Sequence, residues 1–220
     1  MVGRGVDTRL FSPARRTERL RATWGCRGSE TVVLYVGRIA PEKNLGLFVQ
    51  AALAMRAIDA SVRVVLVGDG PQAADLRAQH PDFVFAGMRT GGDLAEHYAS
   101  ADVFLFASTT ETFGNVTLEA MASGLALVAY YYAAARQYLR NVTSALLVPL
   151  DDDAAFVRTA ARLAESPGLA SRLRTEARCA AETASWSRAF DDLERVLRSI
   201  AGASRGGRGA VREDSVHVET

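Results

Sequence analysis

The sequence predicts an α/β fold built on a doubly wound parallel sheet. Short apolar runs that end in glycine or a polar turn alternate with segments of helical periodicity along most of the chain. The runs are apolar at consecutive positions, which is typical of strands buried on both faces. Alternation of strand and helix favours a parallel sheet covered by helices on both sides.

The first predicted strand, residues 31–37, is the sequence TVVLYVG, which is rich in β-branched residues and ends in glycine. Residues 44–58 then have the apolar spacing of an amphipathic helix. Its buried face is expected to carry Leu45, Phe48, Val49, Ala52 and Leu53. Later strands are expected at 62–67, 83–86, 102–106, 125–129 and 145–148. A helix is expected after each of the first four: one to about Gln79, one to Ser100, one that starts near Gly114 or Asn115, and one that runs through Leu139.

The length of 220 residues suits one domain and a tail. Residues 1–30 are expected to be a linker remnant with a short helix at 15–24, and residues 31–200 the folded domain. Helices at 151–165, 168–183 and 187–200 would complete that domain. Residues 201–220 are rich in Gly, Arg and Ser and have little to bury, so we expect a disordered tail.

Composition excludes several classes of protein. A net charge of +1 argues against a nucleic-acid binder that relies on bulk charge. Cys26 and Cys179 are too few for a disulfide framework and lack metal-ligand spacing. The three histidines form no metal-like cluster, and His80 and His97 are expected at the surface. Without a long apolar run or a signal-like start, the expected location is the cytoplasm, and neither a metal nor a nucleic-acid partner is expected.

The stretch 106–125, FASTTETFGNVTLEAMASGL, is the strongest candidate for a binding site. It predicts a strand end, a polar turn and a helix N-terminus, which together present backbone N–H groups and a positive dipole end to an anion. Glu111 and Glu119 bracket the turn, and their carboxylates could accept protons from hydroxyl groups. A ligand that carries both a phosphate and several hydroxyl groups would fit such a site, and a nucleotide-sugar is a ligand of this kind.

Other candidates follow the remaining strands, where an open parallel sheet binds its ligands. Arg38 and Lys43 come after the first strand and suit a diphosphate, although either could be an ordinary surface charge. Residues 68–73 fit the dinucleotide pattern G-x-G-x-x-G/A, but they follow the second strand and Pro71 explains the turn. A turn approached closely by a ligand or by a neighbouring strand is the better interpretation.

The two glutamates also admit other interpretations. Glu111 and Glu119 could be a general acid/base pair, or a loop carboxylate and an early-helix acid stabilised by the dipole. No Ser-His-Asp or Cys-His arrangement can be assembled from the sequence.

Four blocks taken together strongly resemble the retaining glycosyltransferases of family 4, which have the GT-B fold. The blocks are Gly5-Val6-Asp7 with Phe11-Ser12-Pro13, then Val36-Gly37-Arg38 with Glu42-Lys43-Asn44, then Val67-Gly68-Asp69-Gly70-Pro71, then the run 111–125. In the last block the two glutamates match the family's E-x7-E motif. The resemblance covers roughly residues 3–200. The sequence at 130–136 and 145–156 is most similar to the bacterial branch that includes GDP-mannose-dependent α-mannosyltransferases.

The resemblance implies a Rossmann-like domain that binds the donor, with no metal and no cofactor. Arg38 and Lys43 would grip the diphosphate and stabilise the leaving nucleotide. Glu111 would hold donor-sugar hydroxyls, and Glu119 the ribose hydroxyls. The residues implied for catalysis are Arg38, Lys43 and Glu111, and those for donor binding are Gly37, Gly68, Gly70, Met88, Arg89, Phe113, Gly114, Asn115, Val116, Leu118 and Glu119.

The same resemblance implies partners and a reaction. A hexosyl group, with mannosyl the first candidate, would pass from a GDP- or UDP-linked sugar to a lipid or glycan acceptor. The family's N-terminal acceptor domain would be supplied by a partner or by the rest of a longer chain, and that half could associate with the inner face of the membrane. The apolar face of helix 188–200, which would normally cross to that domain, could promote self-association.

Other functions stay open beside this one. A nucleotide-sugar-binding module without turnover is the main alternative, a sugar-nucleotide epimerase of the same fold is a third, and a nicotinamide oxidoreductase a distant fourth. Tyr131 stands where the related branch tends to have an acidic residue, so the role of its loop is open.

Overall fold

A computed structural model describes residues 5–108, 115–131, 144–184, 194 and 198 of the chain. The predicted helix at 187–200 falls outside these ranges apart from its residues 194 and 198, and the stretch 132–139 and the tail 201–220 fall outside them entirely.

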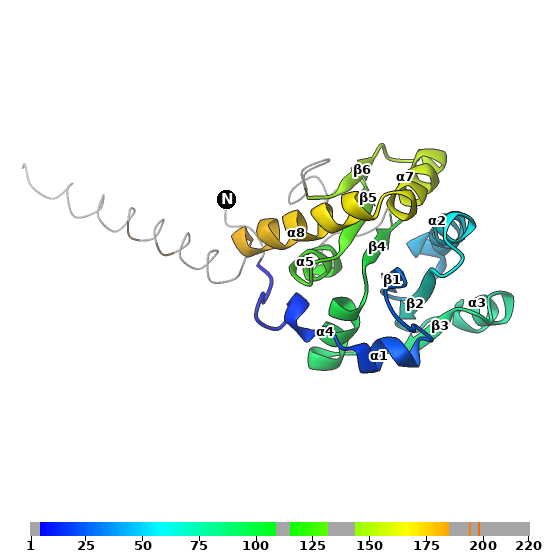
Figure 1. Ribbon diagram of the computed structural model, residues 1–220, viewed down its shortest axis with the longest axis horizontal. Coiled ribbons are helices and arrows are strands. Elements are labelled where there is room, and N and C mark those ends of the chain that lie inside the picture. The colour runs from blue at the N-terminus through cyan, green and yellow to red at the C-terminus, as the bar shows by residue number, and fades with distance from the viewer. Residues whose placement is uncertain (1–4, 109–114, 132–143, 185–193, 195–197, 199–220) are drawn as a thin grey trace, which may run out of the picture.

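The described residues form a six-stranded parallel sheet in the order β3-β2-β1-β4-β5-β6 (Figure 1). The strands are β1 (Val32–Val36), β2 (Arg63–Val67), β3 (Val84–Gly87), β4 (Val103–Phe106), β5 (Ala126–Tyr130) and β6 (Leu146–Val148). Each begins one residue after its predicted start. The predicted doubly wound α/β fold is confirmed.

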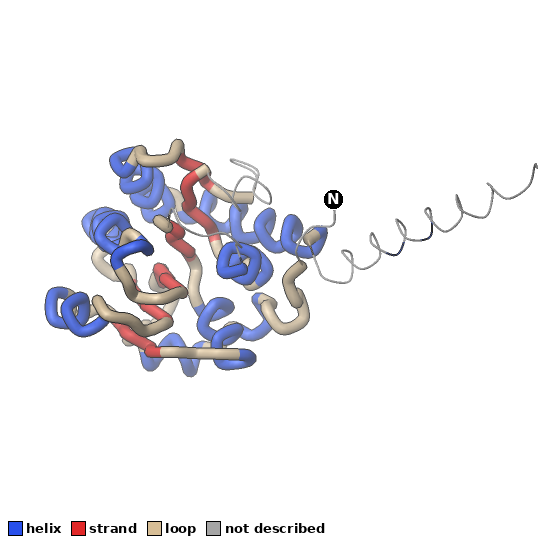
Figure 2. The backbone as a smooth tube through the Cα atoms, turned by 180° about the vertical axis from the view of Figure 1, so that it is seen from behind, coloured by secondary structure: helices blue, strands red, loops and turns tan. Residues whose placement is uncertain are grey.

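Alternating residues of each strand enter two separate cores. In β1, Val33 and Tyr35 face one core, and Val32 and Leu34 face the other; all four are buried. Helices therefore cover both faces of the sheet, as the view from behind shows (Figure 2). This burial on both sides is the reason the strands are continuously apolar in sequence.

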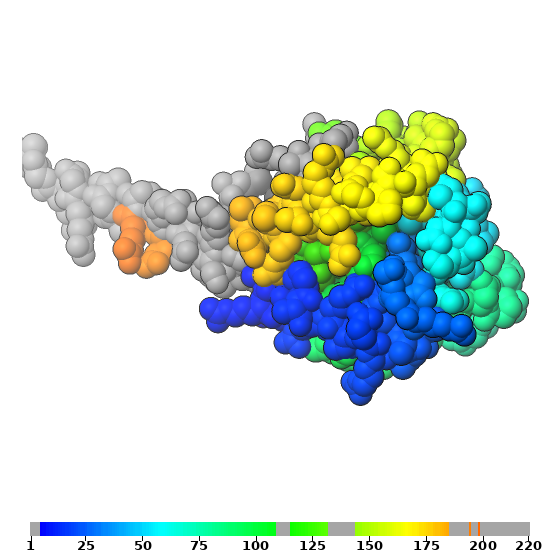
Figure 3. Space-filling view, viewed as in Figure 1, coloured from blue at the N-terminus to red at the C-terminus, as the bar shows by residue number. Residues whose placement is uncertain are grey.

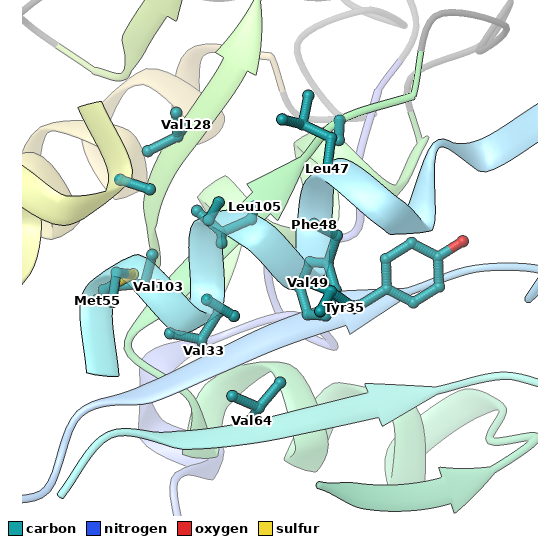
Figure 4. Packing of buried hydrophobic residues seen from close by; sticks show 14 of the residues in the cluster. Val33, Tyr35, Leu47, Phe48, Val49, Met55, Val64, Val103, Leu105 and Val128 are labelled. Carbon is teal, nitrogen blue, oxygen red and sulfur yellow. The ribbon is translucent and has the colours of Figure 1, made fainter. Parts of the chain in front are cut away.

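The first core lies beneath α2 (Leu45–Ile58) and α7 (Asp153–Glu165), which pack against each other. Phe48 and Met55 of α2 reach the sheet beside Val33 and Leu105 (Figure 4). Leu53 is 42% exposed, so its predicted place on the buried face is wrong. One residue step turns a helix by about 100°, which carries Leu53 away from the stripe through Phe48, Ala52 and Met55.

The second core lies beneath α4 (Gly91–Ser100), α5 (Asn115–Ala122) and much of α8 (Pro167–Thr183). The short α3 (Ala73–Gln79) connects β2 to β3. Within the N-terminal segment, η1 (Pro13–Arg15) and α1 (Glu18–Thr23) lead into the domain, and Val6, Phe11 and Trp24 are buried in this second core.

His97 was expected at the surface, and that expectation is wrong. Its side chain is buried in α4 with its ring 5.7 Å from that of Trp24, and its Nδ1 lies 2.8 Å from the carbonyl oxygen of Asp93. The packing of α1 against α4 covers it. A histidine on a helix gives no sequence signal of such a tertiary contact.

Asp102 organises the amino edge of the sheet. One carboxylate oxygen accepts from Arg16 at 3.0 Å and Arg174 at 2.9 Å, and the other from Arg21 at 3.0 Å. The second oxygen also accepts from the backbone N–H of Val32 at 2.9 Å. One side chain thereby joins the N-terminal segment, β1, β4 and α8.

A further arginine of α8 fixes the N-terminal segment. The guanidinium of Arg178 donates to the carbonyl oxygens of Thr8, Phe11 and Ala122 at 3.2, 2.9 and 2.6 Å. In the space-filling view α8 lies directly along this segment (Figure 3). Residues 8–11 are thus held against α5 and α8.

Candidate functional site

The strand order places a topological switch point between β1 and β4. From β1 the chain proceeds outward through β2 and β3, and then returns to the other side of β1 as β4. The connections leaving β1 and β4 lie on opposite faces of the sheet, so a crevice at their carboxyl ends is the expected ligand position. Two helix N-termini, those of α2 and α5, border this edge.

Arg38 stands on the loop after β1 with its side chain 64% exposed. Its guanidinium pairs with Glu42 at 3.1 Å, four residues on, and its carbonyl oxygen accepts from the hydroxyl of Tyr35 at 2.7 Å. A hydrogen bond therefore fixes the backbone at Arg38, whereas its guanidinium is largely exposed to solvent. An exposed pair of this kind contributes about 0–1 kcal/mol, so the guanidinium can exchange Glu42 for an anionic ligand at little cost.

The loop continues through η2 (Pro41–Lys43) into α2, and Lys43 is half-buried at its end. Asn44 is left-handed, with φ 51°, and in the described part of the chain its side chain caps no N–H group of α2. The first amides of a helix lacking such a cap are available to solvent or ligand. Positive charge from the loop and from the helix end therefore meet at one place.

The glycines after β2, Gly68 and Gly70, allow the backbone of the loop after β1 to approach closely. A Cβ on Gly68 would lie 1.9 Å from the carbonyl oxygen of Gly37, and one on Gly70 would lie 2.3 Å from that of Ile39. The loops are also bonded together, with Ile39 N–H donating to Asp69 O and Gln72 N–H donating to Ile39 O. This close approach by a neighbouring loop explains the dinucleotide-like pattern; contact of Gly37, Gly68 and Gly70 with a donor stays a prediction.

Met88 and Arg89 follow β3, at the outer end of the same edge. Met88 is 70% exposed. Arg89 donates to Ala86 O at 2.9 Å and pairs with Asp93 at 3.0 Å in the first turn of α4. They lie two strands away from β1, which separates them from the switch point by the width of β2.

Glu119 lies on the second turn of α5 and is half-buried. It lines a small pocket of about 150 Å³ between α5 and the N-terminal segment, whose other lining residues are Gly5, Val6, Asp7, Phe11, Asn115 and Leu118. Burial raises the pKa of the Glu119 carboxyl above its ordinary value.

The structure brings only part of the predicted site together. Asn115 and Leu118 line the pocket with Glu119, and Val116 is half-buried beside them at the start of α5. Glu111, Phe113 and Gly114 lie outside the described residues, so the geometry of the E-x7-E pair stays a prediction.

Sequence reasoning did not single out Asp7 and Phe11 as part of this site, nor the Tyr98 ring that packs against Phe11. Asp7 accepts from the N–H groups of Arg9 and Leu10, which lowers its pKa and closes a turn that sets Phe11 against the Tyr98 ring at 5.7 Å. The block Gly5-Val6-Asp7 with Phe11 was the available signal for the first two. Tyr98 gave none, because aromatic residues on helices are most often core.

No helix in the described ranges is long and apolar enough to cross a membrane. No three His, Cys, Asp or Glu side chains in those same ranges gather as metal ligands would.

A sequence model of the family described as Glycosyl transferases group 1 matches residues 30–166. The chain belongs to this family. The resemblance to retaining family 4 enzymes is thereby confirmed at the level of the family.

Curated relatives agree with this assignment. The chain is 41% identical over 149 residues to a GDP-mannose-dependent alpha-mannosyltransferase of Mycobacterium tuberculosis, a match covering 68% of this chain and 38% of that protein. It is 33% identical over 220 residues to a D-inositol 3-phosphate glycosyltransferase of Saccharomonospora viridis, covering 93% and 51%. The group 1 chain thus spans about half or less of the length of these relatives.

Solved structures show the same fold. The C-terminal domain of a group 1 glycosyl transferase from Francisella tularensis superposes with a TM-score of 0.71 at 21% identity, covering 81% of this chain and 97% of that one. HepE of Anabaena, solved with UDP and glucose, also gives 0.71 at 21% identity, covering 90% and 55%. The predicted fold of a GT-B C-terminal half is confirmed.

Proposed function

We propose that this group 1 glycosyltransferase domain binds the nucleotide-sugar donor of a retaining hexosyltransferase. The donor would be GDP-mannose and the acceptor a lipid or a glycan. The acceptor site is assigned to the part of the relatives that the match does not cover.

One observation carries the proposal. Two helix N-termini border the switch point, with basic side chains beside one and a carboxylate beside the other. Exposed Arg38 and half-buried Lys43 stand before α2, and the carboxyl of Glu119 stands in the pocket of α5. Cations and helix dipoles attract a diphosphate, while a carboxylate accepts hydrogen bonds from a diol. A nucleoside diphosphate sugar carries both groups.

The proposed roles follow from the family resemblance, and the placement of Arg38, Lys43 and Glu119 supports theirs. Arg38 and Lys43 neutralise charge as the nucleotide leaves, and Glu119 accepts from the ribose hydroxyls. Backbone N–H groups of residues 113–116 meet the sugar and phosphates, Glu111 holds the sugar hydroxyls, and main-chain groups near Met88 and Arg89 meet the base. The glutamates orient the donor, and transfer retains the anomeric configuration.

The choice of GDP-mannose rests on the relatives. The name of the Mycobacterium tuberculosis protein gives GDP-mannose as its donor, and the same description is shared by relatives of Corynebacterium glutamicum at 41% and Mycolicibacterium smegmatis at 39% identity. The matched stretches cover 56–68% of this chain.

A thermal-shift panel with GDP, UDP, ADP, GDP-mannose, UDP-glucose and NAD tests the proposal. Ligands that bind only the folded state raise its melting temperature by mass action. We expect shifts with GDP and GDP-mannose that are lost in Glu119→Gln and kept in Glu182→Gln, a matched change on the exposed face of α8. A response to UDP and UDP-glucose instead would make a UDP-linked sugar the donor in place of GDP-mannose. A response to NAD alone would overturn the proposal.

A further inference from the structure

The pocket that contains Glu119 lies between two parts of the chain that are far apart in sequence. One wall is the segment 5–11, and the other is formed by the first two turns of α5, around Asn115 and Glu119. Neither wall can set the width of the pocket alone. That width depends on the tertiary contacts that hold the segment 5–11 against α5.

Helix α8 supports the first wall at both of its ends. The backbone N–H of Val6 donates to the carbonyl oxygen of Ala184, just beyond the end of α8, at 3.1 Å. Farther along the segment, Nη1 of Arg178 donates to the carbonyl oxygens of Thr8 at 3.2 Å and Phe11 at 2.9 Å. Phe11 lines the pocket, so this guanidinium fixes the backbone of the wall itself.

The same nitrogen of Arg178 also reaches the second wall. It donates at 2.6 Å to the carbonyl oxygen of Ala122, the last residue of α5. The last four carbonyl groups of a helix have no partner within the helix, and a cation near them is favoured by the helix dipole. Three of those in α5 accept from the backbone N–H groups of Ser123, Gly124 and Leu125. Arg178 supplies the partner of the fourth.

We propose that Arg178 is a positioning residue of the donor pocket, whose guanidinium holds the segment 5–11 at a fixed distance from α5. This inference rests on the proposed function for the identity of the ligand. Arg178 lies outside the described lining of the pocket and acts through backbone carbonyl groups of both walls. It therefore sets the width of the pocket without touching the ligand.

The guanidinium of Arg178 is held in one orientation by its other side. Its Nε donates to the carboxylate of Glu182, four residues on in α8, at 2.8 Å, and the side chain is 23% exposed. Hydrogen bonds from a charged donor are stronger than those from a neutral one. Without the guanidinium, three carbonyl groups would need water as their partner. Water can enter only where the segment 5–11 moves away from α5, and the pocket then widens.

A wider pocket should weaken one part of the donor and spare the other. The space is about 150 Å³, so a group that fills it contacts both walls and loses one set of contacts when they separate. In the proposed function that group is the ribose beside Glu119, whereas the diphosphate is assigned to Arg38 and Lys43. Loss of Arg178 should therefore reduce affinity for a nucleoside diphosphate and leave affinity for inorganic diphosphate unchanged.

Hydrogen exchange without any ligand measures the wall itself. The backbone N–H groups of Val6, Leu10 and Phe11 are hydrogen-bonded in the natural protein. Arg178→Met keeps most of the apolar stem and removes the donors. We expect exchange of these three amides to become faster by about tenfold or more, while the amides of β1 and β4 keep their natural rates. Arg172→Met, at an exposed arginine of the same helix, is the matched control. Unchanged exchange at the three amides in Arg178→Met overturns the inference.

Calorimetry with GDP and with inorganic diphosphate measures the consequence for the ligand. Arg178→Met should bind GDP about three- to tenfold more weakly, the value of about one hydrogen bond, and should bind inorganic diphosphate as the natural protein does. Arg178→Lys should recover part of the loss, because an ammonium group has three donors. Glu182→Gln should keep the natural affinity, since the bonds to the carbonyl groups remain. A normal GDP affinity in Arg178→Met, or an equal loss for both ligands, contradicts a positioning role.

Failure of the proposed function is visible separately, in the natural protein. If the natural protein does not bind GDP, the donor assignment fails, and hydrogen exchange alone decides whether Arg178 holds the wall. Where GDP binds, the Glu119→Gln background completes the test. Arg178→Met should reduce GDP affinity less in that background than in the natural protein, because both changes act on one pocket. A full effect there would mean that Arg178 acts elsewhere, and the inference would be wrong.

Discussion

The two edges of the sheet both carry arginines and acids, yet they use them differently. At the amino edge, Asp102 is bonded to three guanidinium groups and one backbone N–H, and Arg21 is fully buried. At the carboxyl edge, Arg38 pairs only with its neighbour Glu42 among the described residues, and its side chain is 64% exposed. A largely buried charge with several partners, such as Asp102, stabilises the fold, whereas an exposed charge, such as that of Arg38, is available to a ligand.

Replacing Asp102 tests the structural side of this contrast and should have the largest effect. Asp102→Asn removes the counterion of the buried Arg21 and of two further arginines. Breaking a buried ion pair by removing one partner costs about 3–5 kcal/mol of unfolding free energy. Urea unfolding followed by circular dichroism would measure it, with m-values compared to confirm the same transition.

Glu182→Gln is the control for that loss, because it removes an exposed carboxylate while Arg178 keeps its hydrogen bonds to the N-terminal segment. Its expected cost is about 0–1 kcal/mol. Equal losses in the two variants would show that the Asp102 network is no more important than a surface pair.

Replacing Gly68 tests how rigid the backbone is at the carboxyl edge, beneath the exposed charge of Arg38. Gly68→Ala would push a methyl into the carbonyl oxygen of Gly37 at a backbone φ of 133°. Strain and overpacking together should cost about 2–4 kcal/mol. Gly168→Ala, whose methyl would meet nothing within 4 Å, is the matched control and should be neutral or stabilising in thermal melts.

A normal melting temperature for Gly68→Ala would mean that the two loops separate easily. The frame that presents Arg38 would then be softer than its hydrogen bonds to the β2 loop indicate.

Replacing Arg38 tests the functional side. Arg38→Ala should weaken nucleoside diphosphate binding by about 1.5–3 kcal/mol, since hydrogen bonds to charged groups are worth that much. The loss should shrink at high salt, because screening already weakens the natural contact. Unfolding free energy should change by less than about 0.5 kcal/mol. Calorimetry at low and high salt checks this, and an affinity unaltered at both would remove Arg38 from the site.

The sheet could be predicted because each strand is a short run buried on both faces. Such runs stand out in sequence, and the structure moved each start by one residue. The loops stand out as candidate site residues for a related reason. Parallel strands place all their carboxyl ends at one edge, so sequence order already indicates which loops lie close together.

The amino-edge network could not be predicted. Asp102 reads as the first residue of an apolar strand, and its partners Arg16, Arg21 and Arg174 stand 86, 81 and 72 positions away. No local pattern distinguishes them from the charges on helix surfaces. The burial of Tyr98 was hidden for the same reason, because its ring contacts with Phe11 and Phe104 join positions that are distant in sequence or on different elements.

Glu119 belongs to both sides of the comparison, and its replacement is expected to raise the stability of the fold slightly. Burial raises its pKa in the folded chain above the unfolded value. Such a group stabilises the fold fully below its unfolded pKa, and that contribution is lost as pH rises through the folded pKa. At neutral pH the carboxylate is therefore a cost to folding. Glu119→Gln should melt higher at pH 7 by about 2–4 °C, equivalent to about 1 kcal/mol, with the difference disappearing near pH 4. Loss of GDP binding together with this gain would show a residue kept for its ligand, whereas a lower melting temperature at pH 7 would place Glu119 with Asp102 among the charges that hold the fold.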